Sequence, residues 1–287
     1  MRAGAVWGLV LLALNGCSRS GAIVVGSKNF TEQIILGEMA AQQIERKLHV
    51  QVPRKLNLGG TLLTHLAIVK GDIDIYPEYT GTGATVVLKQ QKIPTDPAAA
   101  YVMVKSEYAK RFGLVWLPPL GFNDTFAMVV RKRDAARLSA ATLSAARTRA
   151  WRLGIGYEFL TRPDGFTKLN RTYSLSWEGT PKSMDLGLLY EALAQKRVDM
   201  AAGNSTDAQL GDPRVTALRD DKNAFPPYNA CFIVRGALIE QKPEVKWALS
   251  MLQNQVSEET MRGLNRRVEA NHESVTSVVR DFLAGQP

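Results

Sequence analysis

Along the chain, segments with the spacing of apolar residues that is typical of strands are followed by segments with the spacing typical of helices. This pattern predicts strands and helices in turn. An apolar run at residues 22–30 predicts a strand, and the apolar spacing of residues 31–48 predicts a helix with Thr31 as its N-cap. The series continues as strand, helix and strand over residues 50–60, 61–72 and 73–80. Strands that alternate with helices predict βαβ units, in which neighbouring strands are parallel.

The same alternation restarts near residue 114 and predicts a second α/β unit. Extended segments are expected at residues 114–122 and 125–132. The later elements are expected as helix, strand, helix, strand and strand over residues 142–150, 151–157, 183–197, 198–204 and 228–235. The remaining C-terminal residues have helical spacing. The pattern therefore indicates two α/β units, each with a mostly parallel sheet flanked by helices, and a helical tail.

Polar and aromatic residues gather where the expected strands end. These clusters read "GSKNFTE", "LGGT", "YPEYTGT", "GFNDTF", "GYEFLTRPDG", "GNSTD" and "FPPYN". Open α/β sheets bind ligands beside the carboxyl ends of their strands, so the clusters predict one site drawn from both units. Turn chemistry alone explains the glycines and prolines. It explains the aromatic residues, Lys28 and Arg162 less well.

Composition and charge limit the classes of function. The chain has 287 residues, of which 45% are hydrophobic, and this is enough for about two domains. The formal net charge is +9, but the basic residues are spread along the chain. No nucleic-acid-reading motif accompanies the charge, and we expect no nucleic-acid partner.

The first sixteen residues have the layout of a secretory signal peptide. One arginine precedes an apolar run, and "LNGC" ends at Cys17, which resembles a bacterial lipobox with Asn15 as a departure from it. Lipidation of Cys17 would tether the protein to a membrane outside the cytoplasm. An ordinary signal that is cleaved nearby is the alternative. Cys231 then has no disulfide partner and is expected to be a buried structural thiol.

An enzyme is the rival class. The chain has three histidines, His49, His65 and His272, and none lies in a strand-end cluster. No hydrolase, nucleotide-binding or metalloprotease motif is present, and no residues have zinc or calcium spacing. We therefore expect no catalytic residue, no metal and no cofactor.

Several segments together resemble the substrate-binding proteins of ABC importers for glycine betaine, choline and related osmoprotectants. They are "VGSKNFTEQIILGEM", "GDIDIYPEYTGT", "YEFLTRPDGF", "VDMAAGNSTDAQL" and "DDKNAFPPYNACFIVR", in order from about residue 22 to the C-terminus. The resemblance implies a two-lobed, type II periplasmic-binding-protein fold. It also implies a monomer that traps a small molecule between its lobes and delivers it to a membrane permease driven by an ATPase.

The resemblance further implies where the lobes meet. The chain is expected to cross between lobes near residues 123–127 and 226–230. Lobe 1 would comprise residues 22–125 plus 228–287, and lobe 2 residues 126–227. Two crossings form a hinge that can close on a ligand without disturbing either core.

Members of this family commonly hold a quaternary ammonium group against aromatic rings. Such a group has no N–H to donate, whereas the negative face of a ring attracts its charge. The ring positions of the family match Tyr79, Phe126 and Tyr228 here, and Asp124 matches an acidic position beside the cation. Lys28 and Arg162 match positions for the ligand carboxylate, and Thr82 matches a polar contact.

Asn204 departs from the family pattern, because betaine binders of this type often have tyrosine there. The ligand therefore stays open between glycine betaine, choline or carnitine and a bulkier trimethylammonium zwitterion such as ergothioneine. A sensory lipoprotein that has lost transport is a further alternative. Asn204 could also serve only in turn hydrogen bonding.

Each other candidate also has a structural alternative. Lys28 could be a solvated loop residue, Arg162 could pair with Asp164 or Glu158, and Asp124 could cap the crossover. Phe126, Tyr76 and Tyr157 could be buried in the lobes, and Pro77 and Glu78 are expected to shape the turn after the third strand.

Overall fold

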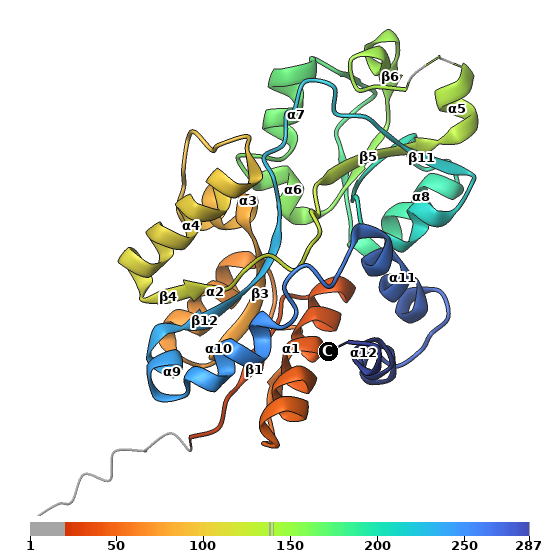
Figure 1. Cartoon of the computed structure of the whole chain (residues 1–287). Helices are drawn as coiled ribbons and strands as arrows, with labels where there is room; N and C mark the ends of the chain where they lie inside the picture. The colour runs from red at the N-terminus through yellow and green to blue at the C-terminus, as the bar shows by residue number, and fades with distance from the viewer. Residues whose placement is uncertain (1–20, 138, 140, 287) are drawn as a thin grey trace, which may run out of the picture.

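The computed structural model describes residues 21–137, 139 and 141–286, and it folds into two α/β lobes (Figure 1). The first sheet has the strand order β2 (Arg54–Lys55), β1 (Val25–Gly26), β3 (Ile75–Tyr79), β12 (Ala230–Arg235) and β4 (Leu114–Trp116). The second has the order β11 (Val215–Leu218), β5 (Phe126–Arg131), β10 (Met200–Asn204), β7 (Leu153–Ile155) and β9 (Lys182–Ser183). A short parallel pair joins β6 (Ala150–Trp151) to β8 (Ser176–Trp177).

The sheets are mixed rather than mostly parallel. In the first, β1 is parallel to β2 and β3, whereas β12 is antiparallel to β3 and β4. In the second, β7 is parallel to β10 and β9, whereas β5 is antiparallel to β10 and β11. The physical reason is the crossing between lobes. β5 and β12 each begin where the chain enters their lobe. Their neighbours, β10 and β3, end at the same edge of the sheet, so each pair is antiparallel.

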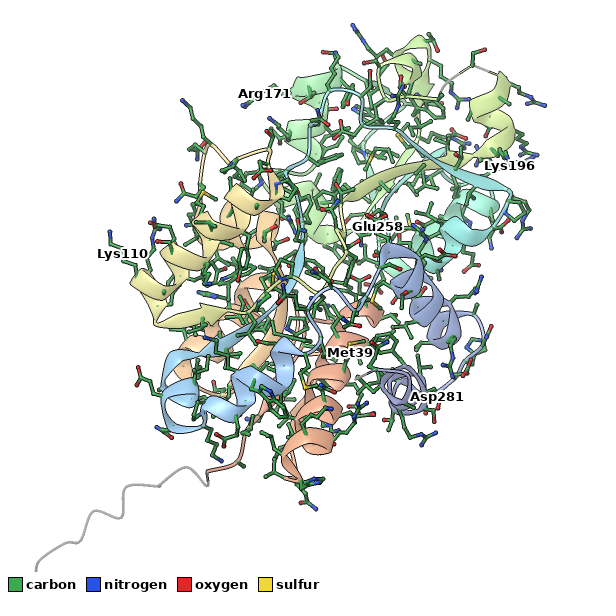
Figure 2. All side chains as sticks on the ribbon, viewed as in Figure 1. Met39, Lys110, Arg171, Lys196, Glu258 and Asp281 are labelled. Carbon is green, nitrogen blue, oxygen red and sulfur yellow. The ribbon has the colours of Figure 1, made fainter. Side chains whose placement is uncertain are left out.

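The helices of the first lobe surround its sheet. They are α1 (Thr31–Leu48), α2 (Thr61–Lys70), α3 (Thr80–Thr82), the π-helical turn η1 (Gly83–Val87), α4 (Pro97–Phe112), α9 (Gly236–Gln241), α10 (Pro243–Ser250), α11 (Glu258–Glu269) and α12 (Val275–Ala284). The central helix α1 packs against α10, α11 and α12, and its Met39 is fully buried. Figure 2 shows Met39 inside the molecule and the exposed Lys110 and Arg171 on the outer surfaces of different lobes.

Helix α1 has the predicted bounds, but Thr31 is not its cap. The N-cap residue is Phe30, and no side chain accepts a hydrogen bond at that end. Helix α2 lies within the expected range 61–72, and its C-cap Gly71 takes the left-handed conformation with φ of 78°.

The second lobe has shorter helices than the sequence predicts. They are α5 (Lys132–Arg137), α6 (Tyr157–Thr161), α7 (Phe166–Tyr173), α8 (Leu189–Ala194) and the 3₁₀ turns η2 (Ala145–Thr148), η3 (Leu186–Leu188) and η4 (Ala208–Gly211). The helix expected at 142–150 is therefore only a 3₁₀ turn. The helix expected at 183–197 is shortened to 186–194, with a 3₁₀ first turn, because Ser183 pairs with β7 in the sheet.

Two segments connect the lobes, between β4 and β5 and between β11 and β12 (Figure 1). They lie side by side: Asn123 and Asn229 form an antiparallel bridge, and the Asp124 N–H donates to the Tyr228 carbonyl at 3.1 Å. Every strand of the first sheet lies within 22–125 or 228–287, and every strand of the second lies within 126–227. That these ranges move as rigid lobes stays a prediction, since α11 packs on both α1 and η4.

Two expectations concern the ends of the chain and its thiols. Cys231 is buried as a free thiol in β12, as expected. The signal peptide at residues 1–16 and Cys17 lie outside the described residues. Within the described part of the chain, no helix is both long and apolar enough to cross a membrane.

Candidate functional site

A cavity of about 580 Å³ lies between the two sheets, with side chains of both lobes in its wall. All eight candidate ligand-binding residues line it: Lys28, Tyr79, Thr82, Asp124, Phe126, Arg162, Asn204 and Tyr228. The structure thus brings together residues that are up to 200 positions apart in the sequence, from Lys28 to Tyr228. Their contact with a ligand stays a prediction.

Tyr79 lies at the end of β3, where the sheet meets the cavity. Its ring is stacked on Phe30 with 6.5 Å between ring centroids, and its hydroxyl donates to Glu32 Oε1 at 2.7 Å. Lys28 Nζ lies 5.3 Å from the centre of the same ring. The Tyr79 ring is therefore held in place by a stacked neighbour and by a carboxylate.

Lys28 is 3% exposed, so the alternative of a solvated loop lysine is wrong. Its ammonium donates to Glu78 Oε1 at 2.5 Å, and Glu78 also accepts from the Tyr76 hydroxyl and the Tyr79 N–H. The expectation that Glu78 shapes a turn is also wrong, because Glu78 is the buried counter-ion of Lys28. This pairing neutralises much of the charge that Lys28 could offer to a ligand. Tyr76 packs in the lobe interior.

Arg162 follows α6 and is held by a buried carboxylate. Its guanidinium donates to Asp164 through two bonds, of 2.9 and 2.7 Å, and to Thr82 Oγ1 at 3.1 Å. Asp164 also accepts from the Tyr228 hydroxyl at 2.6 Å and from Thr85 Oγ1 at 2.9 Å. Although burial alone would raise the pKa of Asp164, the Arg162 charge and these hydrogen bonds lower it. The alternative that Arg162 pairs with Asp164 is confirmed.

Phe126 belongs to an aromatic cluster at the same end of the cavity. Its ring packs edge-on against Phe159, Phe225 and Tyr228, with centroids 4.8, 5.4 and 5.5 Å away. The Arg162 guanidinium carbon lies 4.9 Å from the Phe126 ring centre. Phe126 is therefore partly a packing residue, and part of its ring is already covered by a cation.

A second set of cavity-lining carboxylates, here called the acidic end, comes from the buried Glu32 and Asp124 and the half-buried Asp207. Besides the Tyr79 bond to Glu32, Asp124 accepts from Thr206 Oγ1 at 2.7 Å, and Asp207 accepts from the Tyr190 hydroxyl at 2.6 Å. Burial raises the pKa of Glu32 from 4.5 to about 7 and that of Asp207 from 3.8 to about 6. Burial and the nearby Glu32 raise the pKa of Asp124 well above its usual value.

Hydroxyl and amide groups are the partners of these carboxylates. In the part of the chain that the structure describes, none of the three forms an ion pair with a lysine, arginine or histidine. The cavity wall thus carries three carboxylates that a bound cation would favour in their ionised form, and it also carries the arginine Arg162. Such a site suits a ligand with a cationic group and an anionic group.

Sequence reasoning missed several residues of this acidic end. Glu32 and Asp207 lie in the "GSKNFTE" and "GNSTD" clusters, so their place at strand ends was a usable signal. Tyr190 and Asn265 come from helices, and nothing in the sequence places them here. Asn265 Nδ2 donates to Glu32 Oε2 at 3.2 Å and to the Thr206 carbonyl at 3.0 Å.

Two further residues differ from the simplest expectations. Tyr157 is not buried in a strand; it begins α6 and is 61% exposed at the cavity. Asn204 ends β10 directly opposite Phe126, and its backbone N–H donates to Asp207 Oδ2 at 2.8 Å. The side chain at position 204 thus lies on the cavity wall without supplying a ring.

Comparison with known proteins gives consistent matches over nearly the whole chain. Residues 21–285 match the family model described as the substrate binding domain of ABC-type glycine betaine transport systems. The chain is 33% identical, over 91% of its length, to "Ergothioneine transport permease/ergothioneine binding protein EgtU" of Helicobacter pylori (strain G27), of which it spans only 47%. It is 30% identical to "Carnitine transport binding protein OpuCC" of Listeria monocytogenes, with 95% of this chain and 91% of that protein covered.

Solved structures support the same fold. A crystal structure of a glycine betaine/carnitine/choline ABC transporter protein superposes with a TM-score of 0.78 at 29% sequence identity. The match covers 91% of this chain and 97% of that one. The two-lobed type II periplasmic-binding-protein architecture expected from the sequence is thereby confirmed.

Proposed function

The chain belongs to the family of substrate-binding domains of ABC-type glycine betaine transport systems, and from that premise we propose that its ligand is a quaternary-ammonium zwitterion held in the cavity between the lobes. The family makes it an extracytoplasmic receptor of an ABC importer. The observation that carries the proposal is the polarity of the cavity. Among the described residues, the three carboxylates of Glu32, Asp124 and Asp207 have hydroxyl and amide partners but no basic one, and Arg162 lines the same cavity.

The cationic head of the ligand belongs at the acidic end. A trimethylammonium group cannot donate an N–H hydrogen bond, so it gains from ring faces and from diffuse negative charge. Tyr79 supplies a ring, and its hydroxyl is bound by Glu32. Asp124 is buried and also lines the cavity, so a bound cation would compensate the burial of its carboxylate. Hydrogen bonds already offset part of the cost of keeping these carboxylates ionised, and a bound cation would offset more of it.

The carboxylate of the ligand belongs near Arg162. The Arg162 guanidinium donates two hydrogen bonds to Asp164 and one to Thr82. A ligand carboxylate oxygen would therefore compete for these N–H groups or share them. Tyr228 packs beside Arg162 and fixes Asp164 through its hydroxyl. Lys28, neutralised by Glu78, contributes less than the sequence suggested.

A bulkier zwitterion is the second candidate, and three observations favour it over glycine betaine. The cavity volume of about 580 Å³ lies in the middle of the range for sites that enclose drug-sized ligands. Asn204 leaves open the wall where related betaine binders often have a ring. The 33%-identical relative is named for ergothioneine, a trimethylammonium zwitterion with a side ring.

The remaining parts of the proposal concern location and partners. We propose that Cys17 carries a lipid that tethers the receptor to the membrane, and that the monomer delivers ligand to a separate permease and its ATPase. We also propose that the protein binds without turnover. Mass spectrometry of each ligand after incubation with the purified protein tests that last point.

Calorimetric titration with glycine betaine, choline, carnitine and ergothioneine tests the ligand class. We expect at least one carboxylate-bearing member to bind more tightly than choline, which has no carboxylate. Tyr79→Ala should weaken binding by about 1–2 kcal/mol. Tyr79→Phe is the matched control, since it keeps the ring and removes only the hydroxyl. Absence of binding by all four compounds would eliminate the proposal.

A further inference from the structure

One contact between the lobes lies at the rim of the cavity, apart from the residues proposed to hold the ligand. Glu158, in α6 of the second lobe, accepts from the Thr61 N–H at 2.8 Å through Oε1 and from Thr61 Oγ1 at 3.1 Å through Oε2. Thr61 is the first residue of α2 in the first lobe. The Glu158 side chain is 47% exposed and lines the cavity, which places it at the rim.

Helix α2 has no cap of its own. Its N-cap residue is Gly60, which has no side chain to accept a hydrogen bond, and its first turn contains no acidic residue. The first N–H groups of a helix need acceptors, and an anion near that end is stabilising. Glu158 supplies both the acceptor and the charge, from 97 residues away in the sequence.

Gly60 leaves the space that this carboxylate occupies. A Cβ built at position 60 would lie 2.3 Å from Glu158 Oε1, and its other near neighbours, at 3.4 and 3.9 Å, are also Glu158 atoms. The backbone of Gly60 is extended, with φ of −74°, so an alanine there meets no conformational barrier. A glycine is therefore required at position 60 only when Glu158 contacts Thr61.

We propose that Glu158 is a closure latch: it caps helix α2 of the opposite lobe only when the two lobes are together, and so biases the receptor toward its closed form. When the lobes part, water replaces Glu158 at Thr61, and the carboxylate is solvated. The latch also connects to the ligand site, because Glu158 Oε2 lies 3.8 Å from Arg162 Nη1. This inference concerns lobe closure and stands whether or not the ligand is a quaternary ammonium compound.

Hydrogen exchange and small-angle X-ray scattering of the ligand-free protein test the latch. Glu158→Ala should speed exchange of the Thr61 amide by about fivefold, the equivalent of one helix-terminus charge interaction. It should also raise the radius of gyration toward that of an open form. Glu158→Gln keeps an acceptor oxygen and should give a smaller increase in exchange. The amide of Ala99, capped by Asp96 at the start of α4, is an internal reference that should not change.

A double-mutant cycle separates the latch from a general loss of stability. Gly60→Ala should open the wild-type protein, because the new methyl group collides with Glu158. In the Glu158→Ala background the same substitution should have little further effect. Equal effects of Gly60→Ala in both backgrounds, or unchanged exchange and scattering in Glu158→Ala, would overturn the proposal. Both readouts work without ligand, so failure of the ligand proposal is recognised separately, by the titrations above.

Discussion

Acidification should weaken the binding of a permanently charged ligand, because it protonates the acidic end of the cavity. The pKa of Glu32 is raised from 4.5 to about 7 by burial, and that of Asp207 from 3.8 to about 6. A trimethylammonium group keeps its charge at every pH and favours the ionised carboxylates. Ligand binding at neutral pH should therefore release protons from the site.

The magnitude follows from the Glu32 pKa. If the ligand binds only when Glu32 is ionised, the dissociation constant is multiplied by one plus the ratio of protonated to ionised Glu32. For a pKa of about 7, this factor is about 1.1 at pH 8 and about 100 at pH 5. The affinity should thus fall by up to about 90-fold, or about 2.7 kcal/mol, over this interval.

The stability of the ligand-free protein should change with the opposite sign. Because the folded pKa of Glu32 lies above the value of 4.5, the folded state binds more protons than the unfolded state between pH 4.5 and about 7. Protonated Glu32 contributes to the free energy of unfolding fully below pH 4.5, and this contribution is lost as the pH rises through 7. This group alone therefore makes the empty receptor less stable at pH 8 than at pH 5.

Calorimetric titrations at pH 5, 6, 7 and 8, in buffers of different ionisation enthalpy, measure both the affinity and the protons released. Carnitine is a suitable probe, since its carboxylate stays largely ionised over this range. Glu32→Gln should flatten the pH profile, whereas Glu259→Gln, on the exposed face of α11, should leave it unchanged. A dissociation constant that is the same at pH 5 and pH 8 would refute the reasoning, as would an unaltered profile in Glu32→Gln.

Three substitutions test the rest of the site. Arg162→Ala leaves the buried Asp164 without its counter-ion and should cost about 3–5 kcal/mol of stability in urea unfolding; it should also weaken carnitine more than choline, and equal losses would contradict the proposed orientation of the ligand. Gly81→Ala would place a Cβ 2.5 Å from two ring carbons of Tyr228, so ligand affinity should fall by about 1–3 kcal/mol, whereas unchanged affinity would show that the Tyr228 ring position is unimportant. Asn204→Tyr adds a ring and should strengthen glycine betaine binding by about 0.5–2 kcal/mol, measured by the same titration; weaker binding would mean that the open wall is used by the native ligand.

Much of the local structure could be predicted from the sequence, because the relevant signals are short-range. The spacing of apolar residues in 31–48 defines α1, and Gly71 marks the end of α2. The strand-end clusters also identified the walls of the cavity, since the carboxyl ends of parallel strands meet at one edge of a sheet. The lengths of the helices in 142–150 and 183–197 were overestimated, because strand pairing takes up Thr142 and Ala150 at the two ends of the first segment and Ser183 at the start of the second.

The sequence alone determined the order of strands and helices and the residue types at the strand ends. The spacing of apolar residues can be read from neighbouring residues alone. The tertiary structure alone decided which groups pair. It placed Glu78 against Lys28 and brought Asn265 to Glu32 across 233 positions of the chain. It also buried Glu32 against the hydroxyl of Tyr79 and the amide of Asn265, with no basic partner among the described residues. Burial and charge pairing depend on every element that packs around a side chain, and no local pattern contains that information.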